Sequence, residues 1–320
     1  MRLTLASALA CVTVALLAAA QPSLAQALSC SFSINNLNFG TVDSLSGAPA
    51  RTSANLRASC NGLPNREVVI CPNLGSGTGG AKPTTRSMNN SANILEYQLY
   101  SDPARLIPWG SYLWPYSPKP PEMNLTLDAS GRGSISRQIY GEVFGGQTTA
   151  ATGSYLSTFS GTHATFLYRY APSSCYGAVT GPMVHPNFLV TATVAPNCLI
   201  ATKDVDFGAR GVLSSAVDAT GQVAVTCTPN TSYTVSLSGG LSNGTPTARK
   251  MFKGKETVTY GLYKDPARSQ PWGDASTPGS TMPGSGNGQT RYLPVYGRVR
   301  PQATPSAGVY TDTVVVTVTY

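Results

Sequence analysis

The stretch Leu95-Glu-Tyr-Gln-Leu-Tyr-Ser-Asp-Pro-Ala-Arg105, followed by Pro108-Trp109-Gly110, occurs a second time in altered form further along the chain. The second occurrence is Val258-Thr-Tyr-Gly-Leu-Tyr-Lys-Asp-Pro-Ala-Arg268, followed by Pro271-Trp272-Gly273. Every shared residue is displaced by 163 positions, the gap included, and chance does not readily produce such a match. The sequence therefore contains two copies of one domain.

Further landmarks follow in the same order in both halves. Cys30 and Cys60 are 30 residues apart, and Cys198 and Cys227 are 29 residues apart. The other paired landmarks are Phe39-Gly40 with Phe207-Gly208, Arg86-Ser-Met88 with Arg249-Lys-Met251, Tyr140-Gly141 with Tyr296-Gly297, and Gly153-Ser-Tyr155 with Gly308-Val-Tyr310. The repeat thus spans almost all of the chain after its first 25 residues.

The composition favours strands. The 320 residues include 32 Gly and 24 Pro, which disfavour long helices. Hydrophobic residues make up 41% of the chain and can build a core. Charged residues make up 11%, which is too few for a charged disordered chain. Alternation of period two marks residues 222–227, 233–237, 257–263 and 310–320, and the dipeptides Asn243-Gly244, Pro278-Gly279, Pro283-Gly284 and Asn287-Gly288 mark turns. We therefore predict an all-β protein of two antiparallel β-sandwich domains.

The first 25 residues have the pattern of a secretory signal peptide. Arg2 precedes an apolar run over residues 3–20, and Ser23-Leu24-Ala25 supplies small residues for cleavage. No later stretch is apolar for long enough to span a membrane as a helix. The formal net charge is +8, without a basic run, so the loose group formed by Arg249, Lys250, Lys253 and Lys255 is interpreted as a solvated turn rather than a nucleic-acid site.

Six cysteines follow the predicted signal peptide, and an even number in an exported chain indicates disulfides. We expect the equivalent pairs Cys30–Cys60 and Cys198–Cys227, and we pair Cys71 with Cys175 because both occur only in the first copy. The chain contains no C-x-x-C, and its two histidines, His163 and His185, lie far apart. The sequence therefore predicts no metal site and no cofactor.

The landmarks together resemble the spore coat protein U domain, which occurs in pilin subunits of the archaic chaperone–usher pathway. The resemblance rests on Cys-x8-Phe-Gly, the second cysteine, Leu-Tyr-x-Asp-Pro-Ala-Arg…Pro-Trp-Gly, Tyr-Gly-x-Val and the closing Gly-x-Tyr…Val-x-Val-x-Tyr, and it is looser between Ser111 and Arg137. The two-copy arrangement is similar to the tip adhesin of such pili, which joins an adhesive domain to a pilin domain. It implies immunoglobulin-like sandwiches and donor-strand complementation.

The two copies end differently. After Gly153 the first copy continues to a strand-like stretch, 187–195, in which Phe188, Val190, Ala192 and Val194 can face one side. The second copy has 12 residues after Gly308. We expect 187–195 to complete the first domain in cis, with an ordinary linker strand as the alternative, so that the domains are 26–195 and 196–320.

The second domain is then expected to lack one strand and to borrow it in trans. The strand would come first from a periplasmic chaperone and later from the next pilin subunit, after passage through an outer-membrane usher. The contact residues are expected in the last strand at Val314, Val316, Val318 and Tyr320. The arm of residues 26–29 before Cys30 is too short to serve as a donor strand, which favours a position at the pilus tip.

Apolar loops of the first copy are the candidate surface-binding residues. Tyr112, Leu113, Trp114, Pro115 and Tyr116 stand where the second copy has small polar residues, and Phe144 begins a second uncharged loop. The alternative for the first loop is a lid over the sandwich. We predict attachment to an abiotic or host surface and biofilm formation, with a structural coat or minor pilus subunit as the alternative.

An enzyme is not expected. The matches Gly240-Leu-Ser242-Asn-Gly244 and Gly75-Ser-Gly77-Thr-Gly79-Gly80 fall at corresponding turns of the two copies, and both histidines lie in the first copy, away from Ser242. The two Asp-Pro-Ala-Arg segments are interpreted as turns capped by aspartate. The sequence thus predicts a non-enzymatic protein exported through the periplasm to the cell surface.

Overall fold

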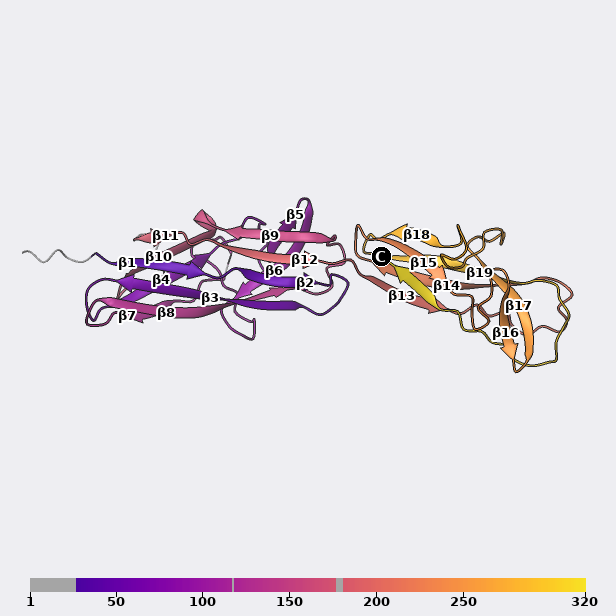
Figure 1. Ribbon diagram of the computed structural model, residues 1–320. Helices are drawn as coiled ribbons and strands as arrows, with labels where there is room; N and C mark the ends of the chain where they lie inside the picture. The colour runs from indigo at the N-terminus through magenta and orange to yellow at the C-terminus, as the bar shows by residue number, and fades with distance from the viewer. Residues whose placement is uncertain (1–26, 117, 177–180) are drawn as a thin grey trace, which may run out of the picture.

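The computed structural model describes residues 27–116, 118–176 and 181–320, so the predicted signal peptide lies outside the described residues. Two β-sandwiches follow one another along the chain, and the C-terminus lies near the junction between them (Figure 1). The described residues contain one short 3-10 helix, η1 (Gly161–His163), and no α-helix. None of them forms a helix long and apolar enough to cross a membrane. The predicted all-β fold of two sandwiches is confirmed.

The described residues of the first sandwich form twelve strands in two sheets. The strands are β1 (Ser29–Ile34), β2 (Leu37–Val42), β3 (Ala50–Asn61), β4 (Glu67–Leu74), β5 (Arg86–Asn90), β6 (Asn93–Tyr100), β7 (Met123–Thr126), β8 (Arg132–Val143), β9 (Gly153–Phe159), β10 (Ala164–Tyr170), β11 (Met183–Val184) and β12 (Phe188–Val194). The order is β1-β3-β8-β6-β5-β9-β12-β2 in one sheet and β11-β10-β4-β7 in the other. All pairings are antiparallel except that of β12 with β2, which is parallel.

The second sandwich is smaller. Its strands are β13 (Cys198–Lys203), β14 (Val217–Cys227), β15 (Ser232–Leu237), β16 (Arg249–Lys253), β17 (Glu256–Tyr263), β18 (Met282–Ser285), β19 (Thr290–Val299) and β20 (Val316–Thr319). The order is β13-β14-β19-β17-β16 in one sheet and β18-β15-β20 in the other. The repeat predicted from the sequence is visible in these orders, because β13-β14-β19-β17-β16 corresponds to β1-β3-β8-β6-β5.

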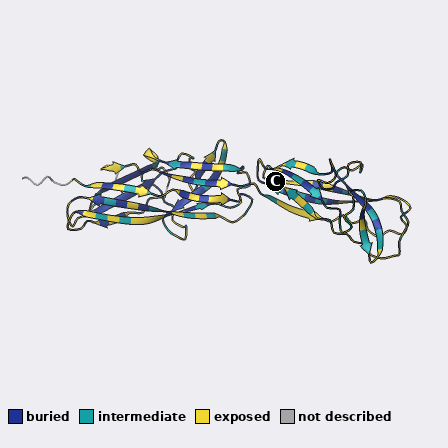
Figure 2. Ribbon diagram, in the orientation of Figure 1, coloured by how far each residue is buried: buried dark blue, intermediate teal, exposed yellow. Residues whose placement is uncertain are grey.

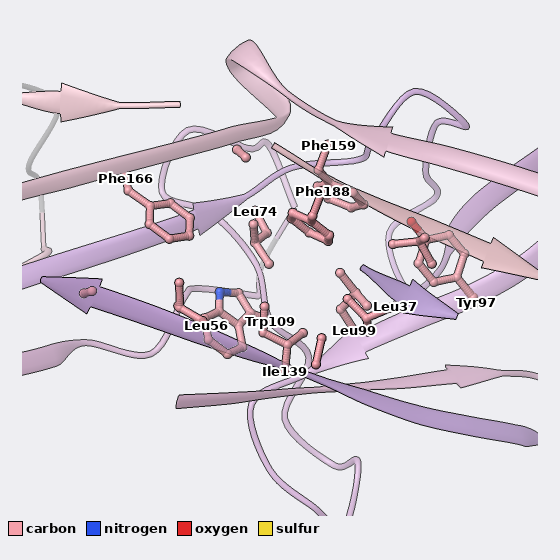
Figure 3. Close-up of a cluster of buried hydrophobic side chains, with 14 of the residues drawn as sticks. Leu37, Leu56, Leu74, Tyr97, Leu99, Trp109, Ile139, Phe159, Phe166 and Phe188 are labelled. Atoms are coloured by element: carbon pink, nitrogen blue, oxygen red, sulfur yellow. The ribbon is translucent and has the colours of Figure 1, made fainter. Parts of the chain in front are cut away.

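Alternating side chains build a separate core in each sandwich. Along β14 and β12, buried residues alternate with exposed or half-buried ones, as a strand with one face on a core requires (Figure 2). In the first core, Trp109 lies among Leu56, Leu74 and Ile139, and its indole Nε1 donates to the Pro72 carbonyl at 2.8 Å (Figure 3). Trp272 is equally buried in the second core and donates to the Val235 carbonyl at 3.2 Å.

The two Asp-Pro-Ala-Arg segments have one structural role. Asp102 Oδ1 accepts the backbone N–H of Ile107 at 2.7 Å, and Asp265 Oδ1 accepts that of Gln270 at 2.7 Å. The guanidinium carbon of Arg105 lies 5.7 Å from the Tyr140 ring centroid, and that of Arg268 lies 5.8 Å from the Tyr296 ring centroid. Each arginine also donates to the backbone carbonyl of the glycine that follows this tyrosine, Gly141 or Gly297. Each segment therefore closes a turn and fixes it to the neighbouring strand.

The first sandwich carries an additional small core on the outer face of its smaller sheet. Val69, Cys71, Leu167 and Cys175 are buried there, and Tyr112 packs on them. This explains why β4 is buried on both faces, with only Glu67 exposed. The corresponding strand β15 alternates buried and half-buried positions, since no such cover is present in the second copy.

Two predicted details are wrong. The last strand is shorter than the predicted 310–320, because residues 308–315 form only the isolated bridge between Thr311 and Phe252 before β20 begins at Val316. Pro283-Gly284, predicted as a turn, lies inside β18. Because β18 is at the edge of its sheet, Pro283 needs no N–H for a second neighbour.

The three expected disulfides are present. They join Cys30 to Cys60, Cys71 to Cys175, and Cys198 to Cys227. The first and third lie at equivalent places, between directly opposed residues of β1 and β3 and of β13 and β14. The second joins β4 to the segment after β10 and closes a separation of 104 residues.

Replacing Cys71 and Cys175 together by Ala should lower the free energy of unfolding of the first sandwich by about 2–5 kcal/mol, because a long closed loop is released in the unfolded chain. Differential scanning calorimetry should show the first-sandwich transition at a lower temperature and the second-sandwich transition unchanged. A shift of both transitions would contradict the separation of the two cores.

Candidate functional site

Strand β12 occupies a position between two other strands of the first sandwich. It runs antiparallel to β9, with Phe188 opposite Phe159 and Ala192 opposite Tyr155, and parallel to β2, with Val190 opposite Leu37. The four residues expected to face inward, Phe188, Val190, Ala192 and Val194, are all at most 2% exposed. The Phe188 and Phe159 rings stack with centroids 4.6 Å apart (Figure 3). Strand β12 is therefore an integral part of the first core.

The segment that lies beside β12 on one side, β2, has a counterpart in the second sandwich. Val205 and Phe207 lie against Gly297, so that a Cβ on this glycine would come within 2.6 and 2.8 Å of their side chains. Leu37 and Phe39 approach Gly141 in the same way in the first sandwich. The glycine of the Tyr-Gly landmark is thus required by the close approach of this flank.

The other flank is likewise held in place. Thr311 forms a bridge to Phe252 of β16, as Leu156 of β9 does to Asn89 of β5. Thr311 accepts from Phe252 at 2.8 Å and donates to it at 3.1 Å. Residues 308–314 therefore follow the course of β9, and only one of their two backbone edges is paired.

In residues 196–320, no strand lies between these two flanks, at the place that β12 occupies in the first sandwich. We call this place, bordered by residues 205–208 and 308–314, the unfilled strand position. Among the described residues, the backbone N–H and C=O groups of Val205, Phe207, Tyr310 and Val314 have no hydrogen-bond partner. Strand edges in this condition are the usual template for pairing with another strand.

Residues at matching places on the two flanks are more exposed in the second sandwich than in the first. Leu37, Tyr155 and Phe159 are at most 1% exposed in the first sandwich. Their counterparts Val205, Tyr310 and Val314 are half-buried and pack against the second core from its rim. The second core is therefore open on the side where β12 closes the first.

A carboxylate stands at the rim of the unfilled strand position. Asp312 Oδ2 accepts the Tyr260 hydroxyl at 2.7 Å, and its Oδ1 accepts the Leu241 N–H at 2.8 Å. Burial and this hydrogen bond raise the pKa of Tyr260. The matching Tyr97 is fully buried, and burial raises its pKa to about 12. Both tyrosines are thus neutral core residues.

The expected contact residues of the C-terminal strand fall in two groups. Val314, Val316 and Val318 are half-buried against the core, and β20 is the outermost strand of its sheet. Tyr320 is 56% exposed, and its hydroxyl lies 3.4 Å from Asn197 Oδ1. Val314 therefore borders the unfilled strand position, whereas Val316 and Val318 lie in β20 of the other sheet and face the core, and Tyr320 lies toward the junction.

The aromatic loop of the first copy, residues 112–116, packs against the sandwich. Tyr112 donates its N–H to Asn73 Oδ1 at 2.7 Å and packs on the small outer core. The Trp114 ring lies 4.8 Å from the Arg86 guanidinium, and Tyr116 donates its hydroxyl to the Ala81 carbonyl at 3.4 Å. All three rings are half-buried, whereas Leu113 and Pro115 are exposed. This arrangement corresponds to the lid, the alternative considered for this loop.

Phe144 lies at the end of the first sandwich that meets the second. Its loop extends to Thr152, whose N–H donates to the Pro229 carbonyl at 3.1 Å. Beside it, Asn197 donates to Asp43 at 2.9 Å. These hydrogen bonds join the Phe144 loop and its neighbourhood to the second sandwich.

A pair of exposed apolar residues was missed by the sequence reasoning. Leu106 and Ile107 are 79% and 59% exposed on the turn that Asp102 closes. The equivalent turn of the second copy has Ser269 and Gln270 at these places. Comparing the two copies side chain by side chain, rather than by their shared residues alone, would have found this difference.

The formal enzyme motifs lie in turns. Ser242 is in the turn after β15, no histidine occurs in residues 196–320, and the described residues hold no group of three metal-ligating side chains. Ser242 therefore has no histidine of its own domain as a base.

Comparisons with solved structures give the fold a context. The chain is similar to the CsuC–CsuE chaperone–tip adhesion subunit pre-assembly complex of archaic Csu pili from Acinetobacter baumannii, with a TM-score of 0.52 and 18% identity over 91% of this chain and 100% of that one. The CupB6 tip adhesin from Pseudomonas aeruginosa matches with a TM-score of 0.35 and 16% identity over 92% of this chain and 94% of that one. No curated protein sequence matches the chain.

The sequence model of the Spore Coat Protein U domain matches residues 13–162 and again residues 185–317. The two matches cover most of the chain, follow the internal repeat, and agree with the resemblance of its cysteine, Phe-Gly and Pro-Trp-Gly landmarks. The chain belongs to the Spore Coat Protein U domain family.

Proposed function

We propose that this protein is a subunit of a pilus assembled by a chaperone–usher pathway, and that its second sandwich receives a strand in trans at the unfilled strand position. The observation that carries the proposal is the contrast within one chain between a position filled by β12 and the same position left open. We further propose residues 1–25 as a signal peptide for export to the periplasm, with domains at 26–195 and 196–320.

An added strand meets both needs of the open position. It pairs with the free backbone groups of residues 205–208 and 308–314, and its alternate side chains cover the half-buried rim. Strand β12 shows the geometry of the completed state: parallel to the first flank, antiparallel to the second, with large, branched and small side chains in turn. The similar complex of a chaperone with a tip adhesion subunit supports a periplasmic chaperone as the first partner.

The later partners follow from the same requirement. A neighbouring subunit that donates its own strand would replace the chaperone at the usher, and the edge formed by Val314, Val316 and Val318 would contact each donor in turn. The first sandwich is complete without such help, so it can stand at the tip of the fibre with its surface free. This arrangement supports a cell-surface tip adhesin.

We place the surface-binding residues on the β6–β7 connection, residues 101–122. Leu106, Ile107 and Leu113 are exposed there, and their apolar side chains lose contact with water when they meet a surface. Many fibres on one cell would add avidity and support biofilm formation. The competing function is a structural subunit without adhesive activity. The protein needs no catalytic residue, cofactor or nucleic acid for either function.

The strand-acceptor proposal is tested with a synthetic peptide of residues 186–195, which contains β12. At about 100 times its dissociation constant, the peptide should stabilise the second sandwich by about 2.7 kcal/mol, because it binds the folded state only. Calorimetry of the full chain should show the second-sandwich transition rising and the first unchanged. A control peptide with Asp in place of Val190 and Ala192 should have no effect. Equal responses to both peptides would refute the proposal.

The adhesion proposal is tested by giving the first copy the residues of the second. Leu106→Ser with Ile107→Gln should leave the turn intact, because Asp265 closes the same turn over Ser269 and Gln270. Burial of one such apolar side chain contributes about 1.5–3 kcal/mol, so attachment by piliated cells should fall roughly tenfold or more. Leu241→Ser, which removes a 68% exposed leucine of the second sandwich, is the matched control. Normal attachment by the double variant would favour the structural subunit.

The lid arrangement predicts a stability effect for the aromatic loop. Replacing Tyr112, Trp114 and Tyr116 by Ser should destabilise the first sandwich by about 1–3 kcal/mol, because it uncovers Arg86 and the outer core. Pro115→Ser, at an exposed position, should have little effect. Unfolding in urea measures both. An unchanged first-sandwich stability combined with lost attachment would instead mean that these rings act at the surface.

A further inference from the structure

Asp312 stands in the second sandwich where the first sandwich has Ser157. Both residues come two positions after the tyrosine of the closing Gly-x-Tyr landmark. Both side chains also pack against an equivalent turn, since a Cβ added to Gly77 would collide with Ser157 Oγ and one added to Gly240 would collide with Asp312 Oδ2. The two copies therefore place a hydroxyl and a carboxylate at the same point of the fold.

In the first sandwich this point lies directly beside the completing strand. Ser157 of β9 is paired with Val190 of β12 in the antiparallel register, and both residues are fully buried. Residues paired in this way have Cβ atoms about 4.5–5.5 Å apart on one face of the sheet. A strand that fills the second sandwich in the same register therefore places one inward side chain next to Asp312.

The other inward residues of the two flanks keep their character between the copies. Apolar or aromatic side chains occupy the matching places in both sandwiches: Leu37, Phe39, Tyr155 and Phe159 in the first, and Val205, Phe207, Tyr310 and Val314 in the second. At the Ser157 place, by contrast, a neutral side chain is replaced by the charged Asp312. A strand suited to the first sandwich thus meets a different chemistry at one point of the second.

The carboxylate becomes more buried when a strand arrives. Asp312 is half-buried in the unfilled strand position, whereas Ser157 is fully buried beside β12. An added strand would bring Asp312 toward the burial of Ser157. A buried charge is destabilising unless hydrogen bonds or an opposite charge compensate it, and a hydroxyl is much less costly to bury.

The chain itself satisfies this carboxylate only in part. Asp312 Oδ1 accepts the backbone N–H groups of Leu241 and Thr313, each at 2.8 Å, and Oδ2 accepts the Tyr260 hydroxyl at 2.7 Å. Arg249 donates to four backbone carbonyls instead, and the ion pairs of the described residues do not include Asp312. A carboxylate has about four acceptor sites, so Oδ2 can accept one more hydrogen bond.

We propose that the strand accepted by the second sandwich carries a hydroxyl-bearing side chain, serine or threonine, at the inward position that Val190 holds in β12, and that this hydroxyl donates to Asp312. The partner is then an alternating apolar strand with one polar residue at this place. The same chemistry disfavours β12 of a second copy of this chain, because Val190 would bury the carboxylate without adding a hydrogen bond. This inference rests on the strand-acceptor proposal and specifies which strand is preferred.

Threonine in place of valine isolates the hydrogen bond from the shape of the side chain. The two residues have similar shapes, and in apolar surroundings the hydroxyl of threonine weakens binding because it is left unpaired. Beside Asp312 the hydroxyl gains a charged acceptor, and a hydrogen bond to a charged group is strong enough to tighten binding about tenfold or more. The sign of the change therefore reports on Asp312.

The test compares three peptides of residues 186–195 on the full chain by isothermal titration calorimetry. The Val190→Thr peptide should bind about tenfold or more tightly than the unaltered peptide. The Val194→Thr peptide is the matched control, because it adds the same hydroxyl at an inward position four residues away from the partner of Ser157. It should bind no more tightly than the unaltered peptide. Equal gains from both threonine peptides would overturn the inference.

The Asp312→Ser variant gives the second sandwich the residue of the first. In this variant the advantage of the Val190→Thr peptide over the unaltered peptide should fall below about threefold, because the charged acceptor is gone. An undiminished advantage in the folded variant would show that Asp312 is not the acceptor. If Asp312→Ser does not fold, the two threonine peptides on the unaltered chain still decide.

The outcomes separate this inference from the strand-acceptor proposal. If the unaltered peptide binds and Val190→Thr gives no gain, the second sandwich accepts strands without the preference inferred from Asp312, and the inference alone is wrong. If none of the three peptides binds, the strand-acceptor proposal is wrong, and this inference is wrong with it.

Discussion

The fold depends on one strand pairing, that of β12 with β9 on one side and β2 on the other. This pairing satisfies the backbone edges of both neighbours and places four apolar side chains in the first core. Where the pairing is absent, in the second sandwich, the same two flanks are no longer regular strands, and their apolar residues are half-buried. A single missing strand thus changes hydrogen bonding and burial together, because both are supplied by the same residues.

The two copies share the residues that hold the fold together and differ in the segments that cover the sandwich. The buried arginine, the Pro-Trp-Gly tryptophan and the aspartate-closed turn have the same partners in both sandwiches. The first copy adds a third disulfide, an aromatic lid and its own completing strand. In the first sandwich these additions fill the strand position and cover the outer face of the smaller sheet. The second sandwich lacks all three, and its strand position is open where β12 lies in the first.

The sequence could predict the framework because its signals are local or repeated. Cysteines at one spacing, a Phe-Gly pair and alternating valines identify strands and their pairing without knowledge of the tertiary fold. Gly40 and Gly208, with φ of 68° and 67°, show why the Phe-Gly pair recurs, since other residues rarely adopt this conformation. The placement of 187–195 could be anticipated because its alternation has no counterpart in the second copy.

The loops could not be predicted in the same way. Tyr112, Trp114 and Tyr116 give the same sequence signal whether they project outward or fold back, and the outcome depends on Arg86 and Asn73, which are distant in sequence. Phe144 begins an uncharged loop whose hydrogen bond to the second sandwich, from Thr152 to Pro229, has no signal in the sequence. Pro283 marked a turn by composition but lies in an edge strand that tolerates it. Each case depends on the surroundings of a residue, which composition and spacing do not contain.

The unfilled strand position is preformed, and this bears on how tightly it can bind. Side-chain contacts with Gly297 hold one flank, and the Thr311–Phe252 bridge holds the other, so neither has to be assembled when a strand arrives. The conformational entropy lost on binding then falls mainly on the incoming strand rather than on both partners. The glycine and the bridge are present in both copies, although the first copy needs no incoming strand. The acceptor geometry is therefore a property of the repeated domain itself, and what distinguishes the two sandwiches is whether the completing strand is supplied within the chain.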